Sequence, residues 1–116
     1  MGSGIIIGET IVKGDGTTQY SMTFPRGGLA ATFIINVLQR IGSTPPSLAV
    51  TVEHKNHDDT AFVNAGSFAA ITSIGLYDLD VTALKEELRF TFTVTATQVY
   101  EGYRIDMLSP TWRPYS

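Results

Sequence analysis

The segment LRFTFTVT, residues 88–95, alternates strictly between apolar side chains and polar or charged ones. Successive side chains of a β-strand point to opposite faces, so this period of two predicts a strand with one face in a core and the other in water. The apolar face carries Leu88, Phe90, Phe92 and Val94, and the other face carries Arg89, Thr91, Thr93 and Thr95. Because such a strand needs partner strands and a second layer, it constrains the fold strongly.

Other segments repeat this pattern, and turn residues separate them. SLAVTVEHK (47–55) and GYRIDML (102–108) alternate in the same way, and QYSMTF and SFAAITSIGLYDL do so more weakly. Clusters such as KGDGTT, GSTPPS and KNHDDT lie between these runs. The sequence therefore predicts an all-β fold, an antiparallel β-sandwich or jelly roll, with at most one short helical turn. The helical candidate is DVTALKEEL, residues 80–88, with Asp80 or Thr82 as its cap.

One segment departs from the simple alternation. ATFIINVLQR, residues 31–40, is apolar on both faces of the predicted strand. Either it is a central strand that is covered on both sides, or its second face contacts a partner chain.

The two ends of the chain differ from its alternating middle. We expect residues 1–12 to form an extended N-terminal arm and residues 13–116 to form a single β-sandwich domain with an aromatic C-terminal tail. The prolines of the tail, SPTWRPYS, disfavour a central strand there. Either both ends pack on a neighbouring subunit, or Trp112 closes the bottom of the sandwich.

Composition and charge argue against several classes of function. The 116 residues contain no cysteine, which excludes disulfides and thiolate sites and agrees with folding in a reducing cytoplasm. The eight basic residues are scattered and the net charge is −3, so we expect no nucleic-acid binding. The most apolar segment, LAATFIINVL, is shorter than the roughly 20 residues of a membrane span, so we expect no membrane association.

The run VEHKNHDDT, residues 52–60, contains both histidines of the chain and raises the question of a metal or catalytic site. His54 and His57 with Asp58 or Asp59 offer nitrogen and oxygen ligands, but aspartate and asparagine are also common turn residues. We interpret the run as the end of a core strand that leads into a polar loop. The chain has no Gly-x-Ser-x-Gly elbow and no specific pair of carboxylates for glycoside hydrolysis. We predict no enzyme activity, no cofactor and no catalytic or metal-binding residues.

Two alternatives concern charged residues near or within the strands. Aspartates near strand ends could bind calcium, namely Asp15, Asp58, Asp59, Asp78 and Asp80. Arg89 and Arg104 lie within strands, where they are solvated or pair with Glu53 or Asp106 across strands. The alternative is that these arginines fix a subunit interface or bind an acidic partner.

The segments VEHKNHDDTAF, LKEELRFTFTVT and YRIDMLSPTWRPY follow one another along the chain. Together they resemble small proteins from the structural gene clusters of tailed bacteriophages and prophages, and the resemblance covers residues 45–115. One position departs from it, because Phe62 stands where a tryptophan is expected. The resemblance implies a structural virion protein at the capsid surface, made in the host cytoplasm. Its expected role is that of a capsid decoration (cement) protein, and a tail or baseplate protein is an alternative.

The resemblance also implies partners. The expected partner is the major capsid protein, and we expect self-association, with a homotrimer as the predicted form. The candidate residues for a partner or subunit interface come from the apolar arm, a C-terminal strand and the tail: Ile5, Ile6, Ile7, Arg104, Trp112, Arg113 and Tyr115. The alternative function is a carbohydrate-binding jelly-roll module, whose candidate aromatic residues are Tyr77, Tyr100, Tyr103 and Trp112.

Overall fold

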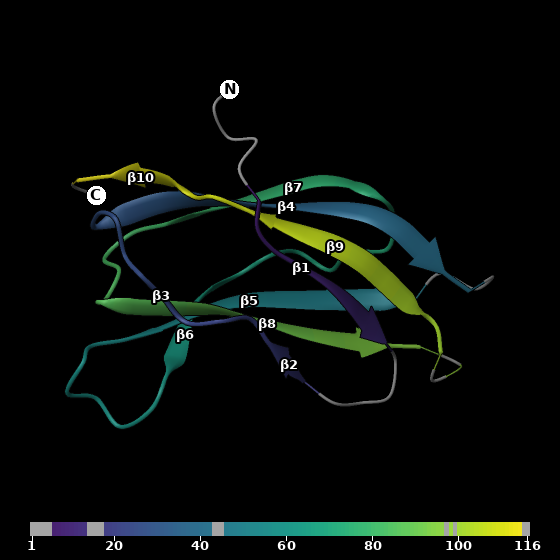
Figure 1. Cartoon of the computed structure of the whole chain (residues 1–116), viewed down its shortest axis with the longest axis horizontal. Helices are drawn as coiled ribbons and strands as arrows, with labels where there is room; N and C mark the ends of the chain where they lie inside the picture. Colours follow the sequence, from purple (N-terminus) through teal and green to yellow (C-terminus); the bar gives the residue numbers. More distant parts are fainter. Residues whose placement is uncertain (1–5, 14–17, 43–45, 97, 99, 115–116) are drawn as a thin grey trace.

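The computed structural model describes residues 6–13, 18–42, 46–96, 98 and 100–114, and it confirms the all-β fold. Within these residues every helix or strand assigned is a β-strand, and the strands form two antiparallel sheets that face each other (Figure 1). None of the described residues forms a helix that is long and apolar enough to cross a membrane.

The ten strands are divided equally between the two sheets. Sheet A contains β1 (Ile6–Lys13), β4 (Ala30–Ile41), β7 (Gly75–Val81), β9 (Gly102–Leu108) and β10 (Thr111–Arg113). Sheet B contains β2 (Gln19–Tyr20), β3 (Phe24–Pro25), β5 (Ser47–Lys55), β6 (Val63–Ser67) and β8 (Glu87–Thr95). The order in sheet A is β1-β9-β4-β7, with β10 beside the first residues of β4 on the same side as β9. The order in sheet B is β2-β8-β5-β6, with β3 next to β2 along the same edge of β8.

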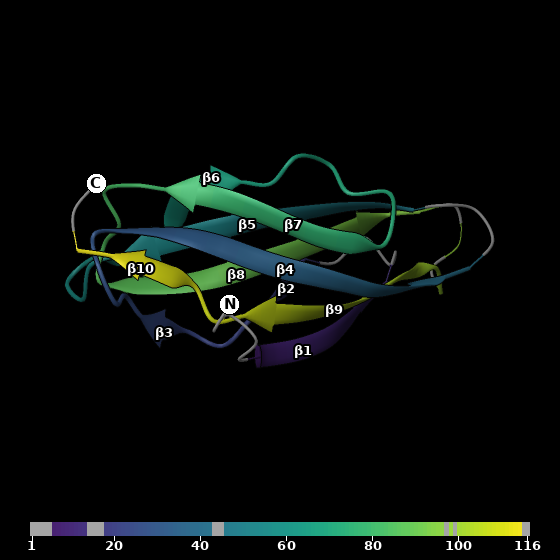
Figure 2. The same cartoon turned by 90° about the horizontal axis from the view of Figure 1, so that it is seen from above.

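The chain passes between the two sheets in the order of a jelly roll. After β1 it enters sheet B for β2 and β3, returns to sheet A for β4, and enters sheet B again for β5 and β6. It then alternates through β7, β8 and β9. Each sheet therefore joins strands from distant parts of the sequence, as two facing Greek keys require. Figure 2 shows β7, β4, β9 and β1 side by side in one layer.

The core lies between the sheets and is formed by the apolar faces that the alternating segments predict. Strands β5, β8 and β9 contribute side chains that are at most 5% exposed: Leu48, Val50, Val52, Leu88, Phe90, Phe92, Val94, Tyr103, Ile105 and Met107. Phe90 contacts Phe33 edge to face and stacks on Phe92, with ring centroids 5.8 and 6.0 Å apart. Trp112 extends this cluster, because its ring centroid lies 6.1 Å from that of Phe33. Trp112 therefore packs against the core within this chain.

The sequence predicts an N-terminal arm over residues 1–12, and the structure describes residues 6–12 of it as part of a sheet. Residues 6–12 do not stand apart from the sandwich but form most of β1, which pairs with β9 from Ile6 to Lys13 and has an irregularity between Ile6 and Gly8. The physical reason is that the backbone groups along this side of β9 need hydrogen-bond partners, which β1 supplies. Residues 1–5 lie outside the described residues.

The helical turn considered for residues 80–88 does not form. Ala83 has a φ of 54°, which lies outside the right-handed helical region. The N–H of Leu84 donates to the carbonyl of Leu29 at 2.9 Å, and the N–H of Lys85 donates to a histidine ring of β5. These tertiary hydrogen bonds take the place of the i to i−4 bonds of a helix.

Candidate functional site

The loop after β5, residues 56–62, continues a core strand into a polar turn, as the sequence predicts. The strand ends at Lys55, and His54 is 9% exposed on its core-facing side. Nδ1 of His54 accepts a hydrogen bond from the N–H of Lys85 at 3.2 Å. Burial lowers the pKa of His54 below its usual 6.5, the charge of Lys85 lowers it further, and Asp59 opposes this shift. The neutral His54 is therefore a structural hydrogen-bond acceptor.

Ion pairs and hydrogen bonds hold this loop against the start of β8. The N–H of His57 donates to Oε1 of Glu86 at 2.9 Å, and its Nδ1 lies 2.7 Å from Oε2 of Glu87. Oδ2 of Asp59 accepts a hydrogen bond from the N–H of Asn56, and this bond is the main cause that lowers the pKa of Asp59. The His57 side chain is 69% exposed, so its contacts with Glu86 and Glu87 contribute little to stability. No group of three or more potential ligands in the described part of the chain could hold a metal ion.

Arg89 makes its contacts on the outer face of sheet B. It lies opposite Glu53 in the β5–β8 ladder, and its Nε donates to Oε1 of Glu53 at 2.8 Å. The guanidinium carbon lies 4.2 Å from the ring centroid of Tyr20 and 4.1 Å from that of Phe62. Of the roles considered for Arg89, cross-strand pairing is the one present within this chain. The aromatic contacts were not predicted, because Tyr20 and Phe62 lie far from Arg89 in the sequence.

Four apolar side chains, from β4, from β7 and from the residue before β7, form a surface that no other described residues cover, and we call it the apolar stripe. Its members are Ile34, Leu38, Ile74 and Leu76. Leu76 is 68% exposed, Ile74 is 60% exposed and Leu38 is 37% exposed, while Ile34 is half-buried. No second layer of the described residues shields this stripe from water. The sequence of β4 is apolar on both faces, and this pattern predicted the part of the stripe that β4 contributes. The contribution of Ile74 and Leu76 was missed because the segment around them alternates only weakly.

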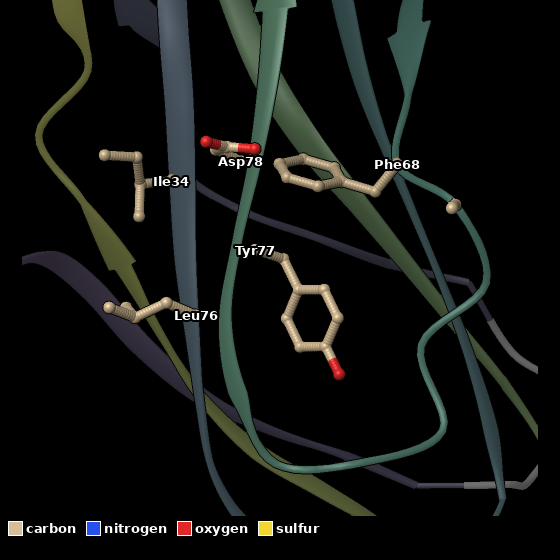
Figure 3. A pocket seen from close by; sticks show the side chains of 6 residues that line it. Ile34, Phe68, Leu76, Tyr77 and Asp78 are labelled. Atoms are coloured by element: carbon tan, nitrogen blue, oxygen red, sulfur yellow. The ribbon is translucent and has the colours of Figure 1, made fainter.

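A shallow hollow of about 340 Å³ lies around β7 at one end of the stripe. Figure 3 shows Ile34 and Leu76 on one side of β7, and Phe68 and Tyr77 on the other. Asp78 is the charged residue of this hollow. The lining of the hollow therefore combines apolar and aromatic side chains with one carboxylate.

The predicted interface residues of the arm and of β9 are only partly described. Ile6 and Ile7 lie in β1, an edge strand that pairs with β9. Arg104 is exposed in β9, next to the core residue Ile105. Ile5 and Tyr115 lie outside the described residues. A role of these residues in partner binding stays a prediction.

The two described interface candidates of the tail make contacts within the chain. Trp112 and Arg113 belong to β10, which pairs with the beginning of β4. The Trp112 ring packs on the core, and Nη1 of Arg113 donates to Oγ1 of Thr32 at 3.0 Å. A partner role for Trp112 and Arg113 also stays a prediction.

The four aromatic residues considered for carbohydrate binding do not form one exposed surface. Tyr103 is fully buried, and its hydroxyl donates to the carbonyl of Pro46 at 2.8 Å. Burial is also the main cause that raises the pKa of Tyr103. The Tyr77 hydroxyl donates to a nearby loop carbonyl, Trp112 is half-buried, and Tyr100 is 56% exposed. The carbohydrate-binding alternative therefore loses Tyr103 as a contact residue.

Among the described residues, the candidate surfaces for function are the polar loop after β5, the Arg89 cluster on sheet B, the apolar stripe and the edge strand β1. Comparison with protein-family models, curated proteins and solved structures finds no match for this chain. The function is therefore inferred from these surfaces and from the sequence resemblance.

Proposed function

We propose that this protein is a structural virion protein, a capsid decoration protein that binds the surface of a phage head and self-associates there. The observation that supports this most is the apolar stripe. The core of the jelly roll is already filled by the inner faces of both sheets, so the stripe is surplus apolar surface. Neighbouring exposed apolar side chains of this kind commonly mark an interaction surface.

The resemblance of residues 45–115 to phage structural proteins supports the phage head as the larger assembly. Contact with the major capsid protein is proposed at the free edge of β1, since among the described residues β1 pairs with β9 alone. An edge strand can accept a further strand through backbone hydrogen bonds. This placement agrees with the predicted interface role of Ile6 and Ile7. In this role the protein uses no catalytic residue, cofactor, membrane or nucleic acid.

The proposal is tested with phage particles assembled from a genome in which the gene for this chain is deleted. The purified chain is added back, and its binding to the particles is measured by sedimentation through a density gradient. We expect saturable binding, and we expect the bound particles to release their DNA at a higher temperature than the bare particles. The absence of binding, or binding without any gain in particle stability, would contradict a decoration role.

A further inference from the structure

We propose that Arg89 binds a carboxylate of the partner protein, an aspartate or glutamate side chain that reaches the outer face of sheet B. The proposal rests on the capsid contact in the proposed function, and it deepens that function by naming a group that the partner supplies. Its basis is the guanidinium of Arg89, whose orientation is fixed within the chain while part of its hydrogen-bonding capacity stays unused.

Three contacts fix the guanidinium of Arg89. Its Nε donates to Oε1 of Glu53 at 2.8 Å across the β5–β8 ladder. Its central carbon also lies over two rings, 4.2 Å from the centroid of Tyr20 in β2 and 4.1 Å from that of Phe62 in the loop after β5. A guanidinium that is already stacked and bonded loses little further freedom when a ligand binds, so the site is preorganised.

The terminal nitrogens of Arg89 are the part that a ligand can use. Nη1 and Nη2 carry the N–H donors that Nε does not, and neither nitrogen makes a hydrogen bond within the described residues. The Arg89 side chain is 26% exposed, so a partner can approach it. The parallel N–H groups at the end of a guanidinium match the two oxygens of a carboxylate, which makes a carboxylate the fitting ligand.

The charges around Arg89 favour a single carboxylate over a polyanion. Glu53 balances part of the charge of Arg89, and Nζ of Lys55 lies 3.8 Å from Oε2 of Glu87. The whole chain has a net charge of −3. A nucleic acid needs a basic surface, which this face lacks. One carboxylate needs only one guanidinium, and the rings beside Arg89 shield such a pair partly from water, which strengthens it.

The position of Arg89 in the sandwich agrees with the proposed capsid contact. Strands β6 and β7 contact each other at one side of the two sheets, whereas β1 contacts β8 towards the other side. The β1 and β2 edges therefore share that second side. Strand β8, which carries Arg89, is next to β2. A partner that binds along the β1 edge can thus reach Arg89 within one interface.

The first test is an NMR titration of the labelled chain with acetyl-glutamate-amide, which carries one carboxylate. Acetyl-glutamine-amide, its neutral analogue, and inorganic phosphate are the comparison probes. We expect saturable shifts of the Tyr20 and Arg89 backbone amides with the glutamate compound, in the millimolar range. The glutamine compound should cause no such shifts, and phosphate should bind more weakly because Glu53 and the net negative charge repel its larger charge.

Two variants separate the geometry of the site from its charge. Arg89→Lys keeps the positive charge but loses the planar pair of donors, so it should weaken binding of the glutamate compound about fivefold or more. Glu53→Gln keeps an acceptor for Nε of Arg89 and removes the competing negative charge, so it should strengthen binding severalfold. A purely structural role of Arg89 would not produce this opposite response.

Arg40→Lys is the matched control, because it makes the same change at an exposed arginine of β4 in the other sheet. It should bind the glutamate compound like the wild type, and the thermal midpoint of every variant confirms that it is folded. The absence of shifts at Tyr20 and Arg89 would overturn the carboxylate site. Phosphate or the glutamine compound binding as tightly as the glutamate compound, or wild-type binding by both Arg89→Lys and Glu53→Gln, would also overturn it.

The same variants are then added to the phage particles that lack this chain. We expect Arg89→Lys to bind the particles more weakly than the wild type and Glu53→Gln to bind them more tightly. Particles that bind both variants like the wild type would overturn the role of Arg89 and leave the proposed function standing. A chain that binds the glutamate compound as expected but binds no particles would contradict the proposed function and leave the carboxylate site standing.

Discussion

His54 couples the stability of the fold to pH, because Nδ1 can accept the hydrogen bond from Lys85 only when it carries no proton. Burial lowers the pKa of His54 in the folded chain below 6.5, the value for an exposed histidine. Between these two pKa values the unfolded chain binds more protons than the folded chain. Stability is therefore fully present above about pH 6.5 and falls as the pH drops through this window.

We predict that His54→Asn removes this pH dependence. The asparagine oxygen lies where Nδ1 of the histidine lies, accepts the same hydrogen bond and does not titrate. The free energy of unfolding, measured with urea at about pH 7.5 and about pH 5.5, should fall more for the wild type than for the variant. Equal losses in the two proteins would contradict the structural role of His54. The alternating pattern predicts that His54 faces the core, but its partner could not be predicted because Lys85 follows a different strand.

The assignment of one face of a strand to the core can be tested with one substitution on each face, and β8 gives the clearest case. Phe92 is 1% exposed and stacks on Phe90, whereas Thr95 at the end of the same strand is exposed. Phe92→Ala should lower the free energy of unfolding by about 3–5 kcal/mol, because it leaves a cavity between the sheets. Thr95→Ala should change it by less than about 0.5 kcal/mol. Similar effects of both substitutions in urea unfolding would contradict the assignment of the faces.

The seating of β10 depends on a glycine. A Cβ atom on Gly28 would lie 2.2 Å from the carbonyl oxygen of Arg113, so Gly28→Ala must displace β10 from β4. We predict a loss of about 1–3 kcal/mol in the free energy of unfolding. A red shift of tryptophan fluorescence should accompany it, since Trp112 is the only tryptophan of the chain. Gly66→Ala is the control, because its Cβ would meet movable side chains of β7 and should leave the emission unchanged. An unchanged emission in Gly28→Ala would show that β10 is not seated as described.

The elements that the sequence predicts are those whose signal is local. Residues 47–55, 88–95 and 102–108 form the strands expected from their period of two, with the expected core faces. Strand β1 was missed because its residues show no alternation and its pairing depends on β9, at the other end of the chain. The local sequence near Ala83 favoured a helical turn, which does not form. The hydrogen bonds that replace it join segments far apart in the sequence, and a local pattern does not reveal them.

At the scale of the whole molecule, the jelly roll gives the two sheets different outer faces. On the outer face of sheet B, Arg89 contacts Glu53, Tyr20 and Phe62 within the chain. The outer face of sheet A leaves the apolar stripe in water. The sequence predicts the sandwich and the apolar second face of β4. It could not show that β7 lies beside β4, and so it could not locate the full stripe.

The measurement that tests the central claim most directly is the copy number of this chain in purified phage particles. Quantitative peptide mass spectrometry is applied to particles induced from the cells that encode the chain, with the major capsid protein as the internal reference. A decoration protein that covers the head is expected in a fixed stoichiometric ratio to the major capsid protein. A few copies per particle would instead indicate a tail or vertex protein. Complete absence from the particles would contradict the virion assignment.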